Sequence, residues 1–138
     1  MVNSVRATML QTQAKRLNAQ NQKLREALAE LFPNVPIFMN VLTEEEIPAE
    51  TMTYLVIETG NYTKMIEKGA SITETVAITF WAMNREDPTL DQLQLIMTGS
   101  DTGLNFTGST NDYIINRDNS QIVNMFTARF TRGVKVGC

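Results

Sequence analysis

Hydrophobic and polar residues alternate most clearly between Ile72 and Met83, in the sequence ITETVAITFWAM. One face of an extended chain would carry Ile72, Val76, Ile78 and Phe80, and the opposite face would carry Thr73, Thr75, Thr79 and Trp81. A period of two residues predicts a strand in an antiparallel sheet that is covered on one face. Trp81 falls in the outer row, where it is either core at the edge of the sheet or an anchor for an interface.

A long helix is predicted from Asn3 to Phe32, because this segment has no Gly or Pro and is rich in good helix formers. A leucine recurs every seventh residue, at Leu10, Leu17, Leu24 and Leu31. This spacing gives one narrow apolar stripe, which suits packing on a sheet or, in the polar N-terminal half, packing on another subunit. The helix would be about 45 Å long. We therefore expect a single domain over residues 1–138, with residues 1–23 as a projecting basic helical extension.

The pattern also predicts four more strands and a second helix. Their expected ranges are a strand at 36–42, a strand at 51–58, a hairpin arm or loop at 61–71, a helix at 84–100, and two hairpin strands at 104–117 and 120–132. Asp87 can cap the second helix and Pro88 suits its first turn. Its buried face is expected to consist of Leu90, Leu93, Ile96 and Met97. The order α-β-β-β-α-β-β predicts an α+β fold, in which a mostly antiparallel sheet of four to five strands carries two helices.

Charges are segregated along the chain, which has 138 residues, 12 Lys and Arg, 15 Asp and Glu, and a net charge of −3. Residues 1–25 have five bases and no acid, residues 26–118 have four bases and 15 acids, and residues 119–138 have three bases and no acid. The three segments therefore carry +5, −11 and +3. An acidic body with two basic ends can steer copies of itself, or a charged partner, into register.

The composition is compatible with few kinds of enzyme site. The chain has no His and a single Cys, Cys138, so it lacks the usual neutral-pH general base and the preferred ligands of zinc. It has no glycine motif for phosphate or dinucleotide binding and no nucleophile elbow. The consecutive acids Glu44, Glu45 and Glu46 indicate a solvated charged run instead of a metal site. We therefore expect no catalytic residue, no metal and no cofactor.

Neither a secretory signal nor a membrane partner is expected, because the N-terminus lacks an apolar core and no apolar run approaches the ~20 residues that span a bilayer. The basic N-terminal helix could contact nucleic-acid phosphates. It has no aromatic residue before Phe32, and the chain as a whole is acidic, so sequence-specific recognition of bases is not expected. A small module that binds nucleic acid is one alternative function.

The order of the segments and their patterns of apolar and polar residues resemble those of phage tail terminator, or tail completion, proteins of the lambda type. The resemblance covers roughly Leu24 to Arg132. It is carried by the helix end LREALAELFP, the apolar strand TYLVIETGNYT, the alternating strand ITETVAITFWAM, the helix segment DQLQLIM after Asp-Pro, and the hairpin segments YIINRDNSQIV and MFTARFTR. The basic segment before Leu24 is longer than the shorter family members need, which suggests an extra contact with the connector.

This resemblance implies an architectural protein without catalytic residues. Proteins of this kind form hexameric rings in the tail and neck region of the virion, which is assembled in the host cytoplasm. The ring caps the tail tube, stops its polymerisation and joins it to the head. The implied partners are further copies of the chain, the major tail tube protein and the head connector or stopper protein, with DNA only passing through the lumen. A connector adaptor or stopper is the alternative part. Exposure and charge predict interface contacts by Arg6, Lys15, Arg16, Lys23, Tyr62, Lys64, Lys68, Trp81, Arg129 and Arg132.

Overall fold

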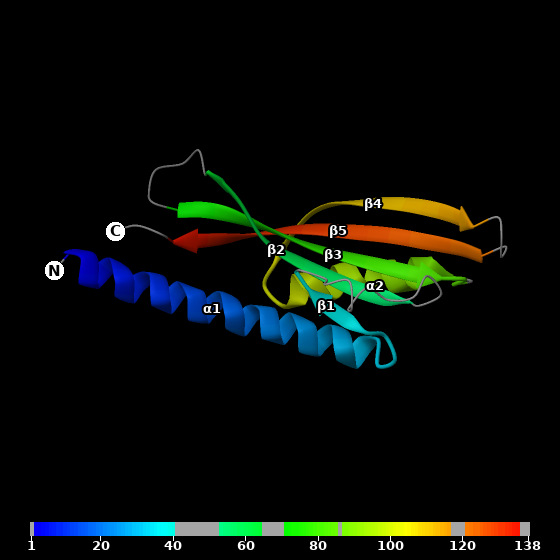
Figure 1. Cartoon of the computed structure of the whole chain (residues 1–138), viewed down its shortest axis with the longest axis horizontal. Helices are drawn as coiled ribbons and strands as arrows, with labels where there is room; N and C mark the ends of the chain where they lie inside the picture. The colour runs from blue at the N-terminus through cyan, green and yellow to red at the C-terminus, as the bar shows by residue number, and fades with distance from the viewer. Residues whose placement is uncertain (1, 41–52, 65–70, 86, 117–120, 136–138) are drawn as a thin grey trace.

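The computed structural model describes residues 2–40, 53–64, 71–85, 87–116 and 121–135, in which two helices pack on a five-stranded sheet (Figure 1). In chain order the elements are α1 (Val2–Leu31), β1 (Ile37–Met39), β2 (Tyr54–Lys64), β3 (Ser71–Met83), α2 (Pro88–Asp101), β4 (Asn105–Asn116) and β5 (Gln121–Lys135). This order confirms the predicted α+β fold class. Neither described helix combines the length and the apolarity that a membrane crossing requires.

The strands lie in the order β1-β2-β3-β5-β4, so β3 and β5 are interior strands and β4 forms one edge. β1 pairs with β2 in parallel, whereas the other three neighbouring pairs are antiparallel. α2 and β4 separate β3 from β5 in the chain, yet the two strands pair continuously from Ser71 and Lys135 to Met83 and Val123. The sheet is therefore mostly antiparallel, as predicted, with β1 as the parallel exception.

Both helices cover the same face of the sheet, and the hydrophobic core lies between them and that face. Its buried members are Leu24, Leu28 and Phe32 from the α1 end, Leu95 and Leu104 from the α2 region, and Leu55, Ile57, Val76, Ile78, Phe80, Ala82, Phe126, Ala128 and Phe130 from the sheet. Phe32 meets Phe80 edge to face, with ring centroids 5.0 Å apart. α2 can approach the sheet closely because Gly99 has no side chain, and a Cβ there would collide with the ring of Phe130.

The first predicted strand extends beyond β1, which ends at Met39, and residues 41–42 of that prediction lie outside the described residues. Asn40 turns the chain there with a φ of 62°. Its side-chain Oδ1 accepts a hydrogen bond from the backbone N–H of Thr59 at 2.7 Å. A turn of this kind interrupts the extended backbone, and the turn itself is then held against β2.

The second predicted strand is too short, because β2 continues past Glu58 to Lys64. Pairing with β3 shifts register between Glu58 and Asn61 and then resumes. Gly60 adopts a φ of 90° within this irregularity, a conformation that glycine tolerates without a steric cost. The described part of the predicted hairpin arm is therefore strand, and its residues 65–70 lie outside the described residues.

Candidate interaction surfaces

The predicted interface residues occupy scattered positions. The exposed ones are Arg6, Lys15, Arg16 and Lys23 on α1, Tyr62 and Lys64 on β2, and Arg129 on β5. Lys68 lies outside the described residues. Trp81 is half-buried, and Arg132 is buried. The described residues of the set thus comprise exposed cations on α1, exposed positions on β2 and β5, and two residues that are not exposed, Trp81 and Arg132.

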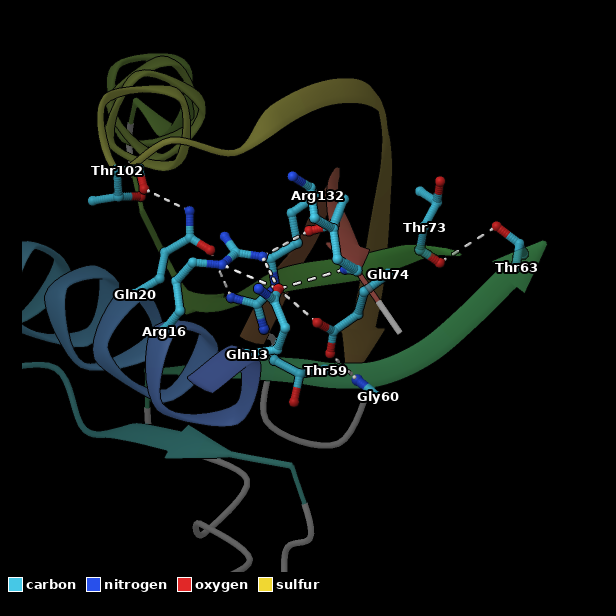
Figure 2. A network of polar contacts seen from close by, with 12 residues as sticks. Gln13, Arg16, Gln20, Thr59, Gly60, Thr63, Thr73, Glu74, Thr102 and Arg132 are labelled. Atoms are coloured by element: carbon cyan, nitrogen blue, oxygen red, sulfur yellow. Dashed lines mark hydrogen bonds and ion pairs between the residues drawn. The ribbon is translucent and has the colours of Figure 1, made fainter. Parts of the chain in front are cut away.

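Arg132 is not the exposed cation that the sequence predicts. It is 4% exposed, and its Nε donates a 2.8 Å hydrogen bond to Oε1 of Glu74, its register partner on β3 (Figure 2). Glu74 is 2% exposed, and its Oε2 accepts from the backbone N–H of Gly60 at 2.8 Å. The strand alternation explains this position, because Arg132 shares the inward row of β5 with Phe130. Arg132 is therefore part of an ion pair inside the chain.

The buried pair also reaches both helices. Arg132 Nη1 donates to Oε1 of Gln20 on α1 at 2.9 Å. The other end of that amide, Gln20 Nε2, donates to the carbonyl of Thr102, directly after α2, at 3.0 Å. Gln20 therefore links α1 to the end of α2 and to the sheet at once (Figure 2).

Earlier turns of α1 hold the last residues of β5. Arg16 Nη2 donates to the carbonyl of Gly133 at 2.9 Å, and Gln13 Oε1 accepts from the N–H of Lys135 at 3.4 Å. The part of α1 from Gln13 onward therefore lies against the domain, and the predicted projection is wrong for residues 13–23. The reason is that polar side chains, which seemed unsuited to packing, bond to backbone groups and to a buried charge.

One signal in the sequence points to Glu74, which is absent from the predicted set. Glu74 falls between Ile72 and Val76 in the apolar row of its strand, and Arg132 has the same relation to Phe130 and Val134. A charged residue at a core position is expensive to bury unless it has a partner. Opposite charges in the inward rows of two strands therefore predict a buried pair, provided that the strands are neighbours.

Trp81 belongs to an aromatic row on the face of the sheet that the helices leave uncovered. Its ring stacks on Tyr54, with centroids 5.8 Å apart and planes at 19°, and Tyr54 meets Phe38 edge to face. Because β3 is an interior strand, Trp81 is not at the sheet edge. Burial raises the pKa of the Tyr54 phenol above 10.0. The role of Trp81 as an interface anchor stays a prediction.

The second helix turns three of its four predicted core residues outward, whereas Ile96 is half-buried and packs against the core. Leu90, Leu93 and Met97 are between 56% and 62% exposed, whereas Leu95 and Gly99 are the buried residues of α2. The three exposed residues follow the i, i+3, i+7 spacing, so they form one stripe along the helix. An apolar stripe that faces away from its own core is an unusual feature of a monomer surface.

Further exposed apolar side chains lie on the neighbouring strands. Tyr113 and Ile115 on β4 and Ile122 on β5 are between 48% and 67% exposed, and Ile115 pairs with Ile122. We call Leu90, Leu93, Met97, Tyr113, Ile115 and Ile122 the α2–β4 surface. A cavity of about 460 Å³ opens beside it, lined by Ala82, Asn84, Arg85, Pro88, Tyr113, Ile122 and Asn124. This part of the molecule therefore offers both an apolar surface and a recess.

Charge separates this region from α1. The segment 87–116 contains four acids and no base, namely Asp87, Asp91, Asp101 and Asp112. Asp91 pairs with Arg85 at 2.9 Å, and the other three are exposed. In contrast, α1 has only bases as far as Arg25. Within the part of the chain that the structure describes, no hydrogen bond or ion pair is formed by the side chains of Arg6, Lys15 or Lys23.

Comparison with known proteins adds no relative from which a site could be transferred. A scan against protein-family models found no match to the chain, and a search of curated proteins also found none. Among the described residues, no group of three or more His, Cys, Asp or Glu side chains is placed to hold a metal ion. Only the surfaces of the chain itself therefore indicate a function.

Proposed function

We propose that this chain is a structural subunit of a tailed phage virion, in which copies of it form a hexameric ring at the end of the tail tube. The ring stops polymerisation of the tube and provides the surface that joins the tail to the head connector. This proposal combines the resemblance of residues 24–132 to tail terminator proteins with the surfaces of the described residues.

The observation that carries the proposal is the outward apolar stripe of α2. A soluble monomer rarely exposes a large contiguous apolar patch, and such a patch commonly marks a surface that binds protein. Leu90, Leu93 and Met97 are more than half exposed, although the spacing of the helix would suit them for a core. Assembly into a ring would cover such a stripe, and a part whose function is assembly requires no reaction centre.

Controlled polymerisation of the tail tube protein from the same phage tests the proposal. We expect the purified chain to limit the length of the tubes and to appear as a ring at one tube end in negative-stain images. Native mass spectrometry of the capped ends should give a hexamer. The matched control is the tube protein with an unrelated acidic protein of similar size. Tubes that grow to the control length, with the chain left in the supernatant, would contradict the proposal.

A connector adaptor or stopper is the second candidate, and the N-terminal turns of α1 favour it. Val5 and Arg6 are exposed on a helix end that bears only positive side-chain charge. A long exposed helix end is suited to docking on a connector. Co-sedimentation separates the two candidates, because an adaptor would bind the head connector in the absence of tube protein and would leave tube length unchanged.

A further inference from the structure

We infer that the N-terminal part of α1 in one copy of this chain docks on the α2–β4 surface of a second copy. This contact is head to tail, and it would link neighbouring subunits of the ring. The inference rests on the proposed function for the existence of a ring, and it adds which two surfaces meet. The committed occupant of the α2–β4 surface is thus a second copy of the chain.

Charge complementarity is the first argument. Residues 1–25 carry five bases and no acid, and the segment 87–116 carries four acids and no base. Arg6 and Lys15 are exposed on α1, and Asp101 and Asp112 are exposed at the end of α2 and on β4. Opposite surface charges steer two proteins together and fix their relative orientation. Two α1 helix starts, or two α2–β4 surfaces, would repel each other.

The apolar stripe of α1 is the second argument. Leu10 lies seven and fourteen residues before Leu17 and Leu24, on the same face of the helix. Exposure along this stripe rises from 1% at Leu24 to 40% at Leu10, and Val5 is 63% exposed. α1 continues for about 16 Å before Gln13, the first of its residues bonded to β5. Among the described residues, the start of the stripe is therefore left largely uncovered.

The positions of the two surfaces also favour a contact between copies. The N-terminus of α1 lies at one end of the long axis of the molecule, and α2 and β4 lie toward the other end (Figure 1). The helix start of one copy therefore reaches the α2–β4 surface of another copy more readily than its own. A contact between two different surfaces generates a closed ring or an open filament. The recess beside Tyr113 and Ile122 is a receptor for an apolar side chain of the incoming helix.

Charge exchange between two variants tests this contact. The first variant is Arg6→Glu/Lys15→Glu and the second is Asp101→Lys/Asp112→Lys. Arg6→Glu near the start of α1 and Asp101→Lys at the end of α2 complement the helix dipole, and Lys15 and Asp112 are exposed, so these changes should not unfold the chain. Each variant alone should dissociate at a protein concentration at least about tenfold above that of the natural chain, since exposed attractions become repulsions.

A 1:1 mixture of the two variants should regain the assembly that each has lost. In the mixture, each altered surface meets one of the opposite charge, and the resulting oligomer alternates the two variants. Native mass spectrometry would resolve this alternation. The conservative variant Arg6→Lys/Lys15→Arg is the control and should assemble like the natural chain. Leu93→Asp, at a position 56% exposed, should weaken assembly without a loss of the folded state.

Three results would overturn the inference. They are a natural chain that stays monomeric, a charge-reversed variant that assembles like the natural chain, and a mixture that fails to reassemble although both variants are folded by circular dichroism. The second and third results leave the proposed function standing if the natural chain still caps tubes. Failure to cap tubes, with the charge exchange working, would instead remove the proposed function and keep the contact.

Discussion

Replacement of Arg132 by methionine is the most direct test of the ion pair that joins β3, β5 and α1. The guanidinium Nε lies 2.8 Å from Oε1 of Glu74, and each of the two side chains is 3% exposed. Methionine keeps much of the apolar volume of arginine but removes its charge and all its donors. Oε1 of Glu74 would then have no cation beside it, and Oε1 of Gln20 would lose its donor.

The expected loss can be worked from this burial. Removal of one partner of a buried ion pair costs about 3–5 kcal/mol, because the other charge stays desolvated and uncompensated. For a domain of this length, 1 kcal/mol corresponds to roughly 4 °C of melting temperature, so Arg132→Met should lower Tm by about 10–20 °C. Removal of both charges in Arg132→Met/Glu74→Leu should restore most of this stability, to within about 1 kcal/mol of the natural chain.

Urea unfolding followed by the fluorescence of Trp81 measures these differences. Arg129→Met is the matched control, because Arg129 lies on the same strand but is exposed, and its replacement should change stability by no more than about 0.5 kcal/mol. A loss below about 1 kcal/mol for Arg132→Met would refute the argument from desolvation. A double variant no more stable than the single variant would also contradict this account, because Glu74 would then not be an uncompensated charge in the absence of Arg132.

Two further predictions concern packing and ionisation. Gly99→Ala should destabilise the chain by about 1–2 kcal/mol. A Cβ at Gly99 collides with the buried ring of Phe130, which places the cost of overpacking toward the upper end of about 1–3 kcal/mol, and the gain in helix propensity offsets about 1 kcal/mol of it. Urea midpoints measure the loss with exposed Ser100→Ala as control, and an unchanged midpoint would contradict the prediction. The phenol of Tyr54 should ionise above pH 10.0, because burial raises its pKa. The folded state therefore favours the neutral phenol, and this contribution to stability is complete below pH 10 and lost as the pH rises further. Ultraviolet titration should lose its latest step in Tyr54→Phe, and a titration curve that keeps that step would disprove the assignment.

The sequence predicts the strands well, because the alternation of side chains between the two faces of a strand depends only on residues that are neighbours in the chain. Val76, Ile78 and Phe80 are buried, and Thr79 and Trp81 on the opposite row are half-buried, as a period of two requires. The same rule assigns an inward position to Arg132, although its charge by itself predicts an exposed one. The outcome depended on Glu74 in the neighbouring strand, and the pairing of β3 with β5 is a long-range property that no local pattern contains.

The second helix illustrates a different limit of prediction. Leu90, Leu93 and Met97 have the spacing of a buried face, yet the residues buried against the sheet include Leu95 and Gly99. Apolar spacing identifies a stripe without identifying what covers it. Close contact with the sheet at Phe130 requires the smallest residue, and this steric condition determines the rotation of the helix. The sequence therefore predicts that Leu90, Leu93 and Met97 form one stripe, but it does not predict that this stripe is exposed.

The two halves of α1 are attached to the domain by different forces, which should give them different local stabilities. Leu24 and Leu28 are buried in the core, whereas Gln13 is half-buried, Arg16 is exposed, and each reaches β5 through a single hydrogen bond. Opening of the N-terminal turns breaks few apolar contacts, so its free energy should lie well below that of global unfolding. Amide hydrogens should therefore exchange progressively more slowly from the start of the helix toward Leu28. The helix can fray from its first turn and re-form without disturbing the sheet, as a segment that must find a neighbouring molecule would need to do.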